Sequence, residues 1–474
     1  MNTKPFTPEE ARKIVECLEK PAVFLNMTTG WPAVAWTVEH LSAALKDKTI
    51  KFRIGKRCTE KAPQFETHCS YIEATLGEFL CWTAGLTGSC IGSFTDYPLS
   101  EYWVYADYKY IALLFQDKDT MFQDVVWSDF GYPGRNGRES TLWIGTEGAN
   151  TPCHLDCYGC NLVFQVQGRK RWHLFPPEDT DCLYPTRIPY EESSVFSQVN
   201  VLQPDLTKFP AFSKARAHVV TLQPGQVLFV PRHWWHYVES VDPVTVSVNS
   251  WIELEVDHKA RVGEALTKTI VCALKTTPSH DNNDDWLNPT EESVASHDEN
   301  MQYLNLAMQA YIGRGAHTGE RSATENRAST RPPKRDSSGC LKKQSIDKIP
   351  VFTVPFGPHL IPVTYDRSLP RNLSGTSHKE RLKSQDSDRG LPQQSPKARP
   401  DDDWERDQAL TEERRLVAHR REETSRSSGD PGKADNEKCG TISTNDVLEC
   451  LVHPDVIALV VKMMMDRQNE IDCG

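Results

Sequence analysis

The sequence lacks the features of several large protein classes. It contains no run of about 18 apolar residues, which a membrane-spanning helix needs, and the residues after Met1 contain no apolar signal core. Its net charge of -11 argues against the basic surface typical of nucleic-acid-binding proteins, and no separate zinc finger is visible. We therefore expect a protein without a membrane segment and without direct nucleic-acid binding.

Cysteine is present, but not in the pattern of a secreted, disulfide-rich scaffold. The 14 cysteines are scattered over 474 residues, a usage that suits reduced thiols in the cytosol. We expect a cytoplasmic protein, with the nucleus as the alternative location. The length allows one domain of about 300 residues with extensions.

A group of potential metal ligands is the most informative motif. His154 and Asp156 form a His-x-Asp pair, and in a β-strand residues i and i+2 point to the same face. His236 follows much later, so it must come from a different strand, and the nearby His233 is an alternative ligand. Two histidines and one carboxylate on one side of an iron leave three positions open, as oxygen-activating non-haem iron enzymes require.

Two other interpretations compete with an iron site. A lone His-x-Asp pair is more often a surface or structural feature than a metal site. Zinc is the alternative metal, because Cys153, Cys157 and Cys160 flank the pair and thiolates suit zinc. This spacing lacks a second cysteine pair, however, and cysteine ligation would disrupt the strand pattern. Iron is therefore the favoured metal.

Short segments rich in Val, Ile, Phe and Trp surround these residues. They are separated by the turn signals Gly168-Arg169, Pro224-Gly225 and Asp242-Pro243. Many short strands with such turns predict a jelly-roll barrel. We predict strands at residues 141–146, 161–167, 170–175, 218–222, 226–230, 235–241 and 244–251.

A series of collinear motifs runs through the predicted barrel, comprising residues 145–156, Asn161, 168–171, 174–177, Pro231 with 234–236, and 248–251. Together they resemble a JmjC domain of the 2-oxoglutarate-dependent oxygenases, in the branch of the asparaginyl hydroxylase that inhibits hypoxia-inducible factor. The resemblance covers residues 20–314 and is strong only after residue 140. It implies a double-stranded β-helix barrel that binds Fe(II) and uses 2-oxoglutarate and O2. It also implies a protein substrate, with hydroxylation favoured over demethylation.

The resemblance implies a role for each matching residue. His154, Asp156 and His236 would bind the iron. Lys170 would pair with the far carboxylate of 2-oxoglutarate, and Thr151 would hydrogen-bond the same carboxylate. The alternative for Lys170 is a solvated lysine in a hairpin.

Two asparagines and a tyrosine complete the implied pocket. Asn161 and Asn249 would line the cosubstrate and metal pocket, with ordinary polar packing as their alternative. Tyr105 is the candidate for the tyrosine that completes the carboxylate site, although the register of residues 103–105 is ambiguous. The stretch 156–161 is one residue longer than in the asparaginyl hydroxylase, so the pocket entrance is expected to differ.

Composition and periodicity divide the whole chain into five segments. We predict an N-terminal extension that caps the barrel (1–140), the barrel core (141–256), post-barrel helices (257–314), a disordered linker (315–440) and a C-terminal helical stretch (441–474). The fold is therefore mainly β with flanking helices. Helices are expected at residues 7–20, 37–46, 70–85, 257–275 and 290–313. The post-barrel helices would either form a homodimer, as in related oxygenases, or pack against their own barrel.

The two segments after residue 315 differ in their content of apolar residues. Residues 315–440 contain few large apolar side chains, so they bury too little surface to offset their ordering entropy, with a transient helix expected at 403–423. Residues 444–466 are apolar again at helical spacing. We predict two short helices that return to the post-barrel helices, and a partner-binding tail is the alternative.

One tripeptide occurs twice within the linker, as Ile349-Pro350-Val351 and Ile361-Pro362-Val363. Proline between two β-branched residues favours an extended chain whose flanking side chains point the same way, a shape suited to strand addition at a sheet edge. The tripeptide resembles the Ile-x-Ile/Val motif that docks on small heat-shock proteins, and two copies would increase avidity. Coincidence in a Pro-rich stretch is the alternative.

Two functions are consistent with these features. The first is an Fe(II)- and 2-oxoglutarate-dependent protein oxygenase that also binds small heat-shock proteins in a stress response. The second is a non-catalytic JmjC scaffold that binds and modulates small heat-shock proteins. The intact set of His154, Asp156, His236 and Lys170 favours the first, because a decayed scaffold commonly loses one of them.

Overall fold

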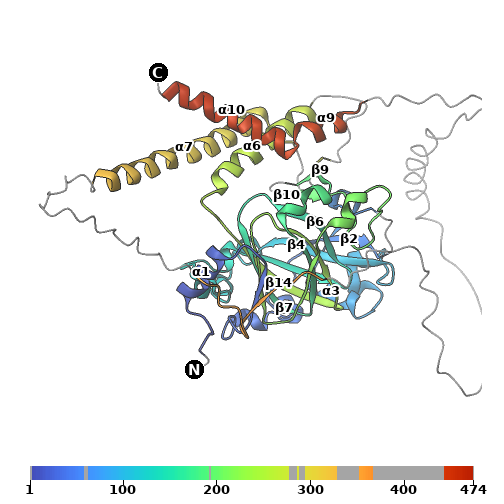
Figure 1. The fold of residues 1–474 in the computed structure, drawn as a ribbon. Helices are drawn as coiled ribbons and strands as arrows, with labels where there is room; N and C mark the ends of the chain where they lie inside the picture. Colours follow the sequence, from blue (N-terminus) through green and yellow to red (C-terminus); the bar gives the residue numbers. More distant parts are fainter. Residues whose placement is uncertain are drawn as a thin grey trace, which may run out of the picture. The chain divides into compact units, whose positions relative to one another are not determined.

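The apolar segments of the chain form two antiparallel β-sheets in the computed structural model (Figure 1). The structure describes residues 3–57, 62–191, 194–276, 286–287, 294–327, 352–366 and 442–472. All of them belong to one compact unit, residues 1–371 and 442–474, and a second unit, 372–441, lies outside the described residues. None of the described helices has the length and apolarity needed to cross a membrane.

The larger sheet has nine strands, and its central strands come from the predicted barrel. In spatial order they are β15 (Leu360–Pro362), β1 (Ala22–Phe24), β12 (Val227–Val230), β7 (Cys160–Gln167), β14 (Val244–Ile252), β5 (Thr141–Thr146), β4 (Tyr102–Tyr110), β2 (Ile50–Lys56) and β3 (Ser70–Ala74).

The smaller sheet has six strands and carries most of the candidate site. In spatial order they are β11 (His218–Leu222), β8 (Lys170–Phe175), β13 (Trp235–Ser240), β6 (Asn150–Asp156), β10 (Ser194–Ser197) and β9 (Pro185–Glu191). Consecutive strands such as β7 and β8 lie in different sheets, as a jelly-roll requires. Gly168 makes this corner with φ +62°, and a Cβ there would overlap a backbone carbonyl oxygen of β14.

The predicted barrel strands are confirmed to within one residue at each end. Residues 141–146, 170–175 and 218–222 match β5, β8 and β11, and the other four predictions match β7, β12, β13 and β14. The prediction from β-branched and aromatic segments between turn signals succeeds here because most of these strands are buried along nearly their whole length. The mainly β jelly-roll with flanking helices is thus the fold of the protein.

The residues before the barrel contribute both helices and strands. Thr7 caps α1 (Pro8–Cys17) in a capping box with Glu10, as its sequence indicates. The other helices of this region are α2 (Val38–Leu45), α3 (Leu76–Thr83), α4 (Ile111–Leu114) and α5 (Asp119–Gln123). Short 3-10 helices connect the elements of this region: η1 (Pro32–Ala35), η2 (Glu66–His68), η3 (Ser89–Phe94), η4 (Trp127–Phe130) and η5 (Gly137–Glu139). Two more, η6 (Pro177–Cys182) and η7 (Pro210–Lys214), lie between strands of the barrel.

The expected helix at 70–85 is wrong in its first part. Residues 70–74 form β3, which pairs with β2, and the helix starts only at Leu76 after the cap residue Thr75. Five residues beside an existing sheet edge gain ladder hydrogen bonds, an advantage that local helix propensity does not reveal.

The helices after the barrel pack on one another. They are α6 (Asp257–Lys275), α7 (His297–Arg327), α9 (Thr444–Leu451) and α10 (Pro454–Asp472). One buried cluster contains Val262 and Leu266 of α6, Leu304 of α7, and Ile457 and Val461 of α10. Figure 1 shows these three helices side by side. The predicted return of the C-terminal helices is confirmed, whereas the homodimer stays a prediction.

The expected linker 315–440 is wrong at two places. Helix α7 continues to residue 327, and residues 352–366, which we name the strap, lie on the barrel, with β15 paired to β1. Averaged composition hides this short apolar segment, whose Leu360 is fully buried. Ile349 and Val351 lie outside the described residues, as does the helix expected at 403–423.

Candidate metal centre

Three potential metal ligands meet on two neighbouring strands of the smaller sheet. His154 and Asp156 lie on β6, and His236 lies directly opposite His154 on β13. The Nε2 atoms of His154 and His236 lie 3.8 Å and 4.0 Å from the carboxylate oxygens of Asp156. One ligand atom from each residue lies within 4.8 Å of the other two. The strand alternation expected from the sequence therefore puts His154 and Asp156 on one face, and the pairing of β13 with β6 brings His236 to the same point.

Hydrogen bonds orient both histidines for metal binding. Nδ1 of His154 lies 2.9 Å from the carbonyl oxygen of Pro152, and Nδ1 of His236 lies 2.9 Å from that of Trp234. A proton on Nδ1 satisfies each carbonyl and leaves the lone pair on Nε2 free for a metal. Burial, and then the proximity of His236, lower the pKa of His154, so its ring is neutral as a ligand requires.

The carboxylate of the group is also held in place. The indole N–H of Trp251 donates to Oδ2 of Asp156 at 3.1 Å. Burial raises the pKa of Asp156, while His236 and this hydrogen bond oppose the shift. The cluster thus offers two imidazole nitrogens and one carboxylate, a ligand set that favours a divalent metal such as iron.

The alternative ligands lie elsewhere. His233 directs Nε2 to the carbonyl oxygen of Cys157 at 3.2 Å and does not belong to the group. The thiols of Cys153 and Cys160 lie in two separate apolar clusters, and burial raises the pKa of each. Within the part of the chain that the structure describes, the group of His154, Asp156 and His236 is the one suited to a metal.

Lys170 lies on β8, with its ammonium group inside the barrel. Its Nζ donates to the hydroxyl oxygens of Ser247 at 2.9 Å and of Tyr105 at 3.2 Å. No carboxylate of the described residues forms an ion pair with it. Burial lowers the pKa of Lys170 to about 7, and the charge of Asp107 opposes this shift without cancelling it. A buried cation of this kind lacks the anion that would compensate its desolvation.

Tyr105 and Thr151, which were predicted to share the carboxylate site with Lys170, line the same cavity as Lys170. Tyr105 accepts a hydrogen bond from Lys170, and its hydroxyl is also hydrogen-bonded to the side chain of Thr151. The ambiguous register of residues 103–105 is therefore resolved in favour of Tyr105. Ser247 was not predicted, although it lies two residues before Asn249 on β14 and so shares its face. This alternation is the signal that could have identified it.

Asn161 and Asn249 are joined to each other rather than to the metal group. Nδ2 of Asn249 donates to Oδ1 of Asn161 at 2.9 Å, and the indole N–H of Trp143 donates to Oδ1 of Asn249 at 2.8 Å. Both asparagines line the cavity that contains Lys170 and the two histidines. The complete lining is Tyr105, Tyr108, Trp143, Thr151, His154, Asn161, Val163, Lys170, Trp172, His236, Val238, Ser247, Asn249 and Trp251.

A buried arginine supports the tyrosine side of this cavity. Arg53 on β2 is fully buried, and its guanidinium carbon lies 5.6 Å from the ring centroid of Tyr105. Its Nε lies 2.8 Å from Oδ2 of Asp107, and Glu66 lies further away at 3.9 Å. Burial raises the pKa of Glu66 to about 7. The sequence contained no signal for this group, whose members come from three separate segments.

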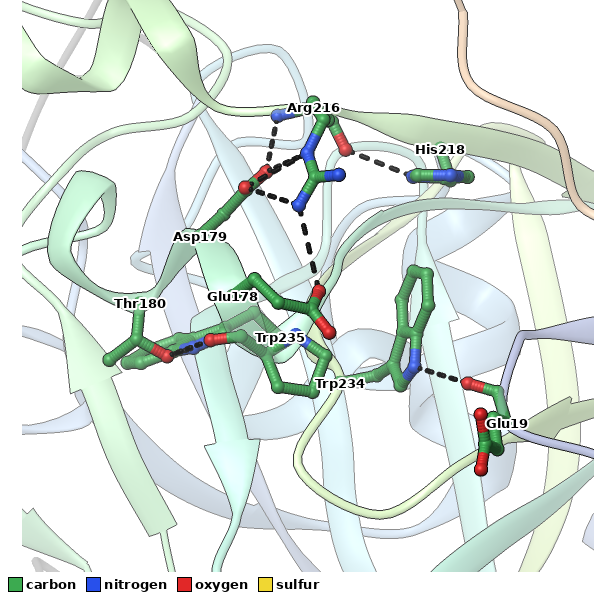
Figure 2. Close-up of polar contacts among 9 residues, drawn as sticks. Glu19, Glu178, Asp179, Thr180, Arg216, His218, Trp234 and Trp235 are labelled. Carbon is green, nitrogen blue, oxygen red and sulfur yellow. Dashed lines mark hydrogen bonds and ion pairs between the residues drawn. The ribbon is translucent and has the colours of Figure 1, made fainter.

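The strand start that carries His236 is anchored on both sides (Figure 2). The indole N–H of Trp234 donates to the carbonyl oxygen of Glu19 at 2.9 Å, and that of Trp235 donates to the hydroxyl of Thr180 at 3.0 Å. Beside them, Arg216 forms a bidentate pair with Asp179. The two indole bonds hold the backbone at the start of β13, next to His236.

Comparison with known proteins agrees with this geometry. The family model of the cupin-like domain matches residues 8–258. The zebrafish (Danio rerio) protein "HSPB1-associated protein 1 homolog" is 60% identical over 476 residues, which is 99% of this chain and 100% of the relative. The human (Homo sapiens) "HSPB1-associated protein 1" is 48% identical over 479 residues, 99% of this chain and 95% of the relative.

A more distant similarity links the chain to demethylases. "Lysine-specific demethylase 8" of Xenopus tropicalis is 29% identical over 242 residues, which is 49% of this chain and 48% of the relative. The matched family model covers more than half of the chain, and the first two relatives align over nearly all of it. The chain therefore belongs to the family of cupin-like JmjC-domain proteins, in the group formed by the HSPB1-associated protein 1 sequences.

Proposed function

We propose that the protein is an Fe(II)- and 2-oxoglutarate-dependent protein oxygenase. One observation carries the proposal: His154 and His236 line the same cavity as the ammonium of Lys170, and Asp156 completes a ligand group with the two histidines. An iron ligand set and a receptor for a dicarboxylate are the two elements that this reaction class requires. A decayed scaffold has no reason to retain a buried lysine whose burial costs free energy.

The residues present fit the groups that they would hold. Nε2 of His154, Nε2 of His236 and one oxygen of Asp156 would bind Fe(II), and Lys170 with Tyr105 would bind the far carboxylate of 2-oxoglutarate. When bound, these groups supply an oxidant that inserts one oxygen atom of O2 into a C–H bond while 2-oxoglutarate becomes succinate and carbon dioxide.

The chain itself contributes orientation and exclusion of water. The backbone bonds of the two histidines hold their Nε2 atoms toward the cavity. Tyr108, Trp143, Trp172 and Trp251 form an aromatic wall around it. Such a wall lowers the local dielectric and thereby strengthens the interaction of Lys170 with a carboxylate. The protein thus orients the reactants in a largely apolar cavity.

Succinate formation tests the proposal directly. Purified protein with Fe(II), 2-oxoglutarate, ascorbate and a peptide pool from a cell extract is expected to produce succinate. The double variant His154→Ala/Asp156→Ala is expected to produce none, whereas the matched variant His233→Ala, which alters a histidine outside the group, retains turnover. Absence of both metal and cosubstrate binding in the wild-type protein would refute the proposal and favour the adaptor function.

The substrate is a protein, and hydroxylation is favoured over demethylation. The similarity to a lysine-specific demethylase leaves demethylation as the second candidate reaction. Mass spectrometry of the substrate distinguishes the two, because hydroxylation adds one oxygen atom and demethylation removes a methyl group. We further propose that the reaction takes place in the cytoplasm.

We also propose that the protein binds small heat-shock proteins and acts in the stress response. The name of its relatives, HSPB1-associated protein 1, supports this partner, and the two Ile-Pro-Val tripeptides offer a binding motif. Alanine at both Ile349 and Ile361 is expected to abolish binding to a small heat-shock protein core domain. Unchanged affinity would refute the motif as the binding element.

A further inference from the structure

The second Ile-Pro-Val tripeptide is part of a strand of the protein's own barrel. Its strand, β15, pairs in antiparallel fashion with β1. The amide of Leu25 donates to the carbonyl oxygen of His359 at 3.0 Å, and the amide of Val363 donates to that of Pro21 at 2.9 Å. The edge of the larger sheet is therefore covered by residues that the chain supplies itself.

The strap, residues 352–366, joins the two sheets as well as extending one of them. At its start, Phe352 lies beneath the ammonium of Lys13 in α1, at 4.5 Å from the ring centroid. At its end, Tyr365 pairs with His218 of β11. The amide of Asp366 donates to the carbonyl oxygen of Ala217, the residue before β11, at 3.0 Å. Strand β1 of the larger sheet and strand β11, at the edge of the smaller sheet, are thus linked by one continuous segment.

The strap also reaches the apolar cluster behind the candidate metal site. Val363 is 7% exposed and belongs to the same buried cluster as Trp172 and Trp234. The ring of Trp172 stacks on His236 with a centroid distance of 5.8 Å and an interplanar angle of 28°. Removal of Val363 would therefore open the packing that supports a metal-ligand candidate.

The flanking side chains of this copy do not share one environment. Ile361 is 42% exposed, whereas Val363 is buried and Leu360 is fully buried. The pairing of β15 ends at Pro362, so the two flanking residues lie on either side of the end of the strand. The expectation that their side chains point the same way stays a prediction. The barrel thus recognises Leu360 and Val363, rather than the isoleucine of the tripeptide.

The two copies differ at the position that the barrel buries most completely. Leu360 precedes the second tripeptide, but Lys348 precedes the first. A lysine in place of Leu360 would bury an ammonium group in an apolar core, which is costly without a partner anion. The first copy therefore cannot replace the second on β1.

We propose that the protein withholds its second tripeptide from partners: residues 360–363 bind the protein's own β1 edge. Capture of the second copy by a partner requires release of the strap. The effect on partners rests on the proposed binding of small heat-shock proteins, whereas the docking of the strap does not.

A matched pair of variants tests the assignment. Ile349→Ala and Ile361→Ala make the same change in the same tripeptide, and the exposed Ile361 can be truncated without undocking the strap. In full-length protein titrated against the core domain of a small heat-shock protein, Ile349→Ala is expected to lose most of the affinity and Ile361→Ala to retain it. Loss of affinity in Ile361→Ala would overturn the assignment.

A gain-of-function variant tests the sequestration. Leu360→Lys gives the second copy the local sequence of the first, so the strap should be released. In the Ile349→Ala background this change is expected to restore binding of the core domain. Absence of restored binding, despite demonstrated release of the strap, would overturn the proposal.

Hydrogen–deuterium exchange monitors the strap without a partner. The amides of Leu25 and Val363 are expected to be protected in the wild-type protein and to exchange rapidly in Leu360→Lys. Rapid exchange in the wild type would overturn the docking of the strap. If the wild-type protein binds no small heat-shock protein, the proposed partner fails, and exchange alone then decides whether the second copy is a strand of the barrel.

Discussion

Replacement of Lys170 by methionine tests the dicarboxylate site without a large change of shape. The side chain is 2% exposed, and its ammonium donates to Tyr105 and Ser247 but forms no ion pair with a described carboxylate. Methionine has a similar length and no charge. We expect Lys170→Met to weaken 2-oxoglutarate binding and to leave the fold at least as stable, because the variant no longer buries an uncompensated amine.

The expected loss of affinity follows from the hydrogen bonds to a charged group. Such bonds contribute about 1.5–3 kcal/mol, and about 1.4 kcal/mol corresponds to a factor of ten, so Kd should rise by about 10- to 150-fold. Isothermal titration of anaerobic Fe(II)-loaded protein with 2-oxoglutarate measures this value, and thermal unfolding serves as the control for folding. An unchanged Kd in a folded variant would refute the assigned role of Lys170.

The same titration as a function of pH gives a second test. Burial lowers the pKa of Lys170 to about 7, so the ammonium is present below this pH and is lost above it. Because the carboxylate binds the charged form, binding above pH 7 requires proton uptake, and Kd should rise by up to about tenfold per pH unit. This dependence should be absent in Lys170→Met. A wild-type Kd that is constant from neutral to alkaline pH would contradict the reasoning.

Three further predictions concern stability, each measurable by urea unfolding. Leu360→Ala should lower the free energy of unfolding by about 2–5 kcal/mol, whereas the exposed Ile361→Ala should cost less than about 1 kcal/mol; equal effects would contradict the docked strap. Arg187→Met should lower the free energy of unfolding by about 3–5 kcal/mol, because it removes the bidentate ion pair between Arg187 and the buried carboxylate of Glu264. An unchanged free energy of unfolding would contradict the importance of this pair. Gly168→Ala should destabilise the corner between the sheets, since its Cβ would overlap a backbone carbonyl oxygen, and wild-type stability would exclude this overlap.

The strands were predictable from short apolar segments between turn signals, and the pair of His154 and Asp156 was predictable from the alternation of side chains along a strand. A residue spacing of two places His154 and Asp156 on one face wherever the strand lies, and buried strands with a regular pattern have a strongly specified register. The pairing of His236 opposite His154 needed the order of strands in the sheet, for which the resemblance to JmjC domains supplied the answer.

The surroundings of Lys170 were predictable only in part: Tyr105 was the candidate tyrosine with an ambiguous register, and Ser247 was not predicted. Tyr105 reaches Lys170 in a strand whose register shifts between Ala106 and Lys109, where Tyr108 has a positive φ of 50°. A bulge of this kind changes which side chains face the cavity, and no local pattern indicates it. Arg53 and Asp107 were missed because their pairing is a contact between separate strands.

By itself, the sequence determined the jelly-roll fold, the ligand types at the candidate metal site and the presence of two identical tripeptides. Only the tertiary structure decided that one of these tripeptides belongs to the barrel. The difference is physical: strand alternation is a property of each segment, whereas the place of residues 360–363 depends on an open edge at β1 and on space for Val363 beside Trp172. Leu360 favours docking on that edge because its apolar side chain is buried there, whereas a lysine such as Lys348 at this position would disfavour docking.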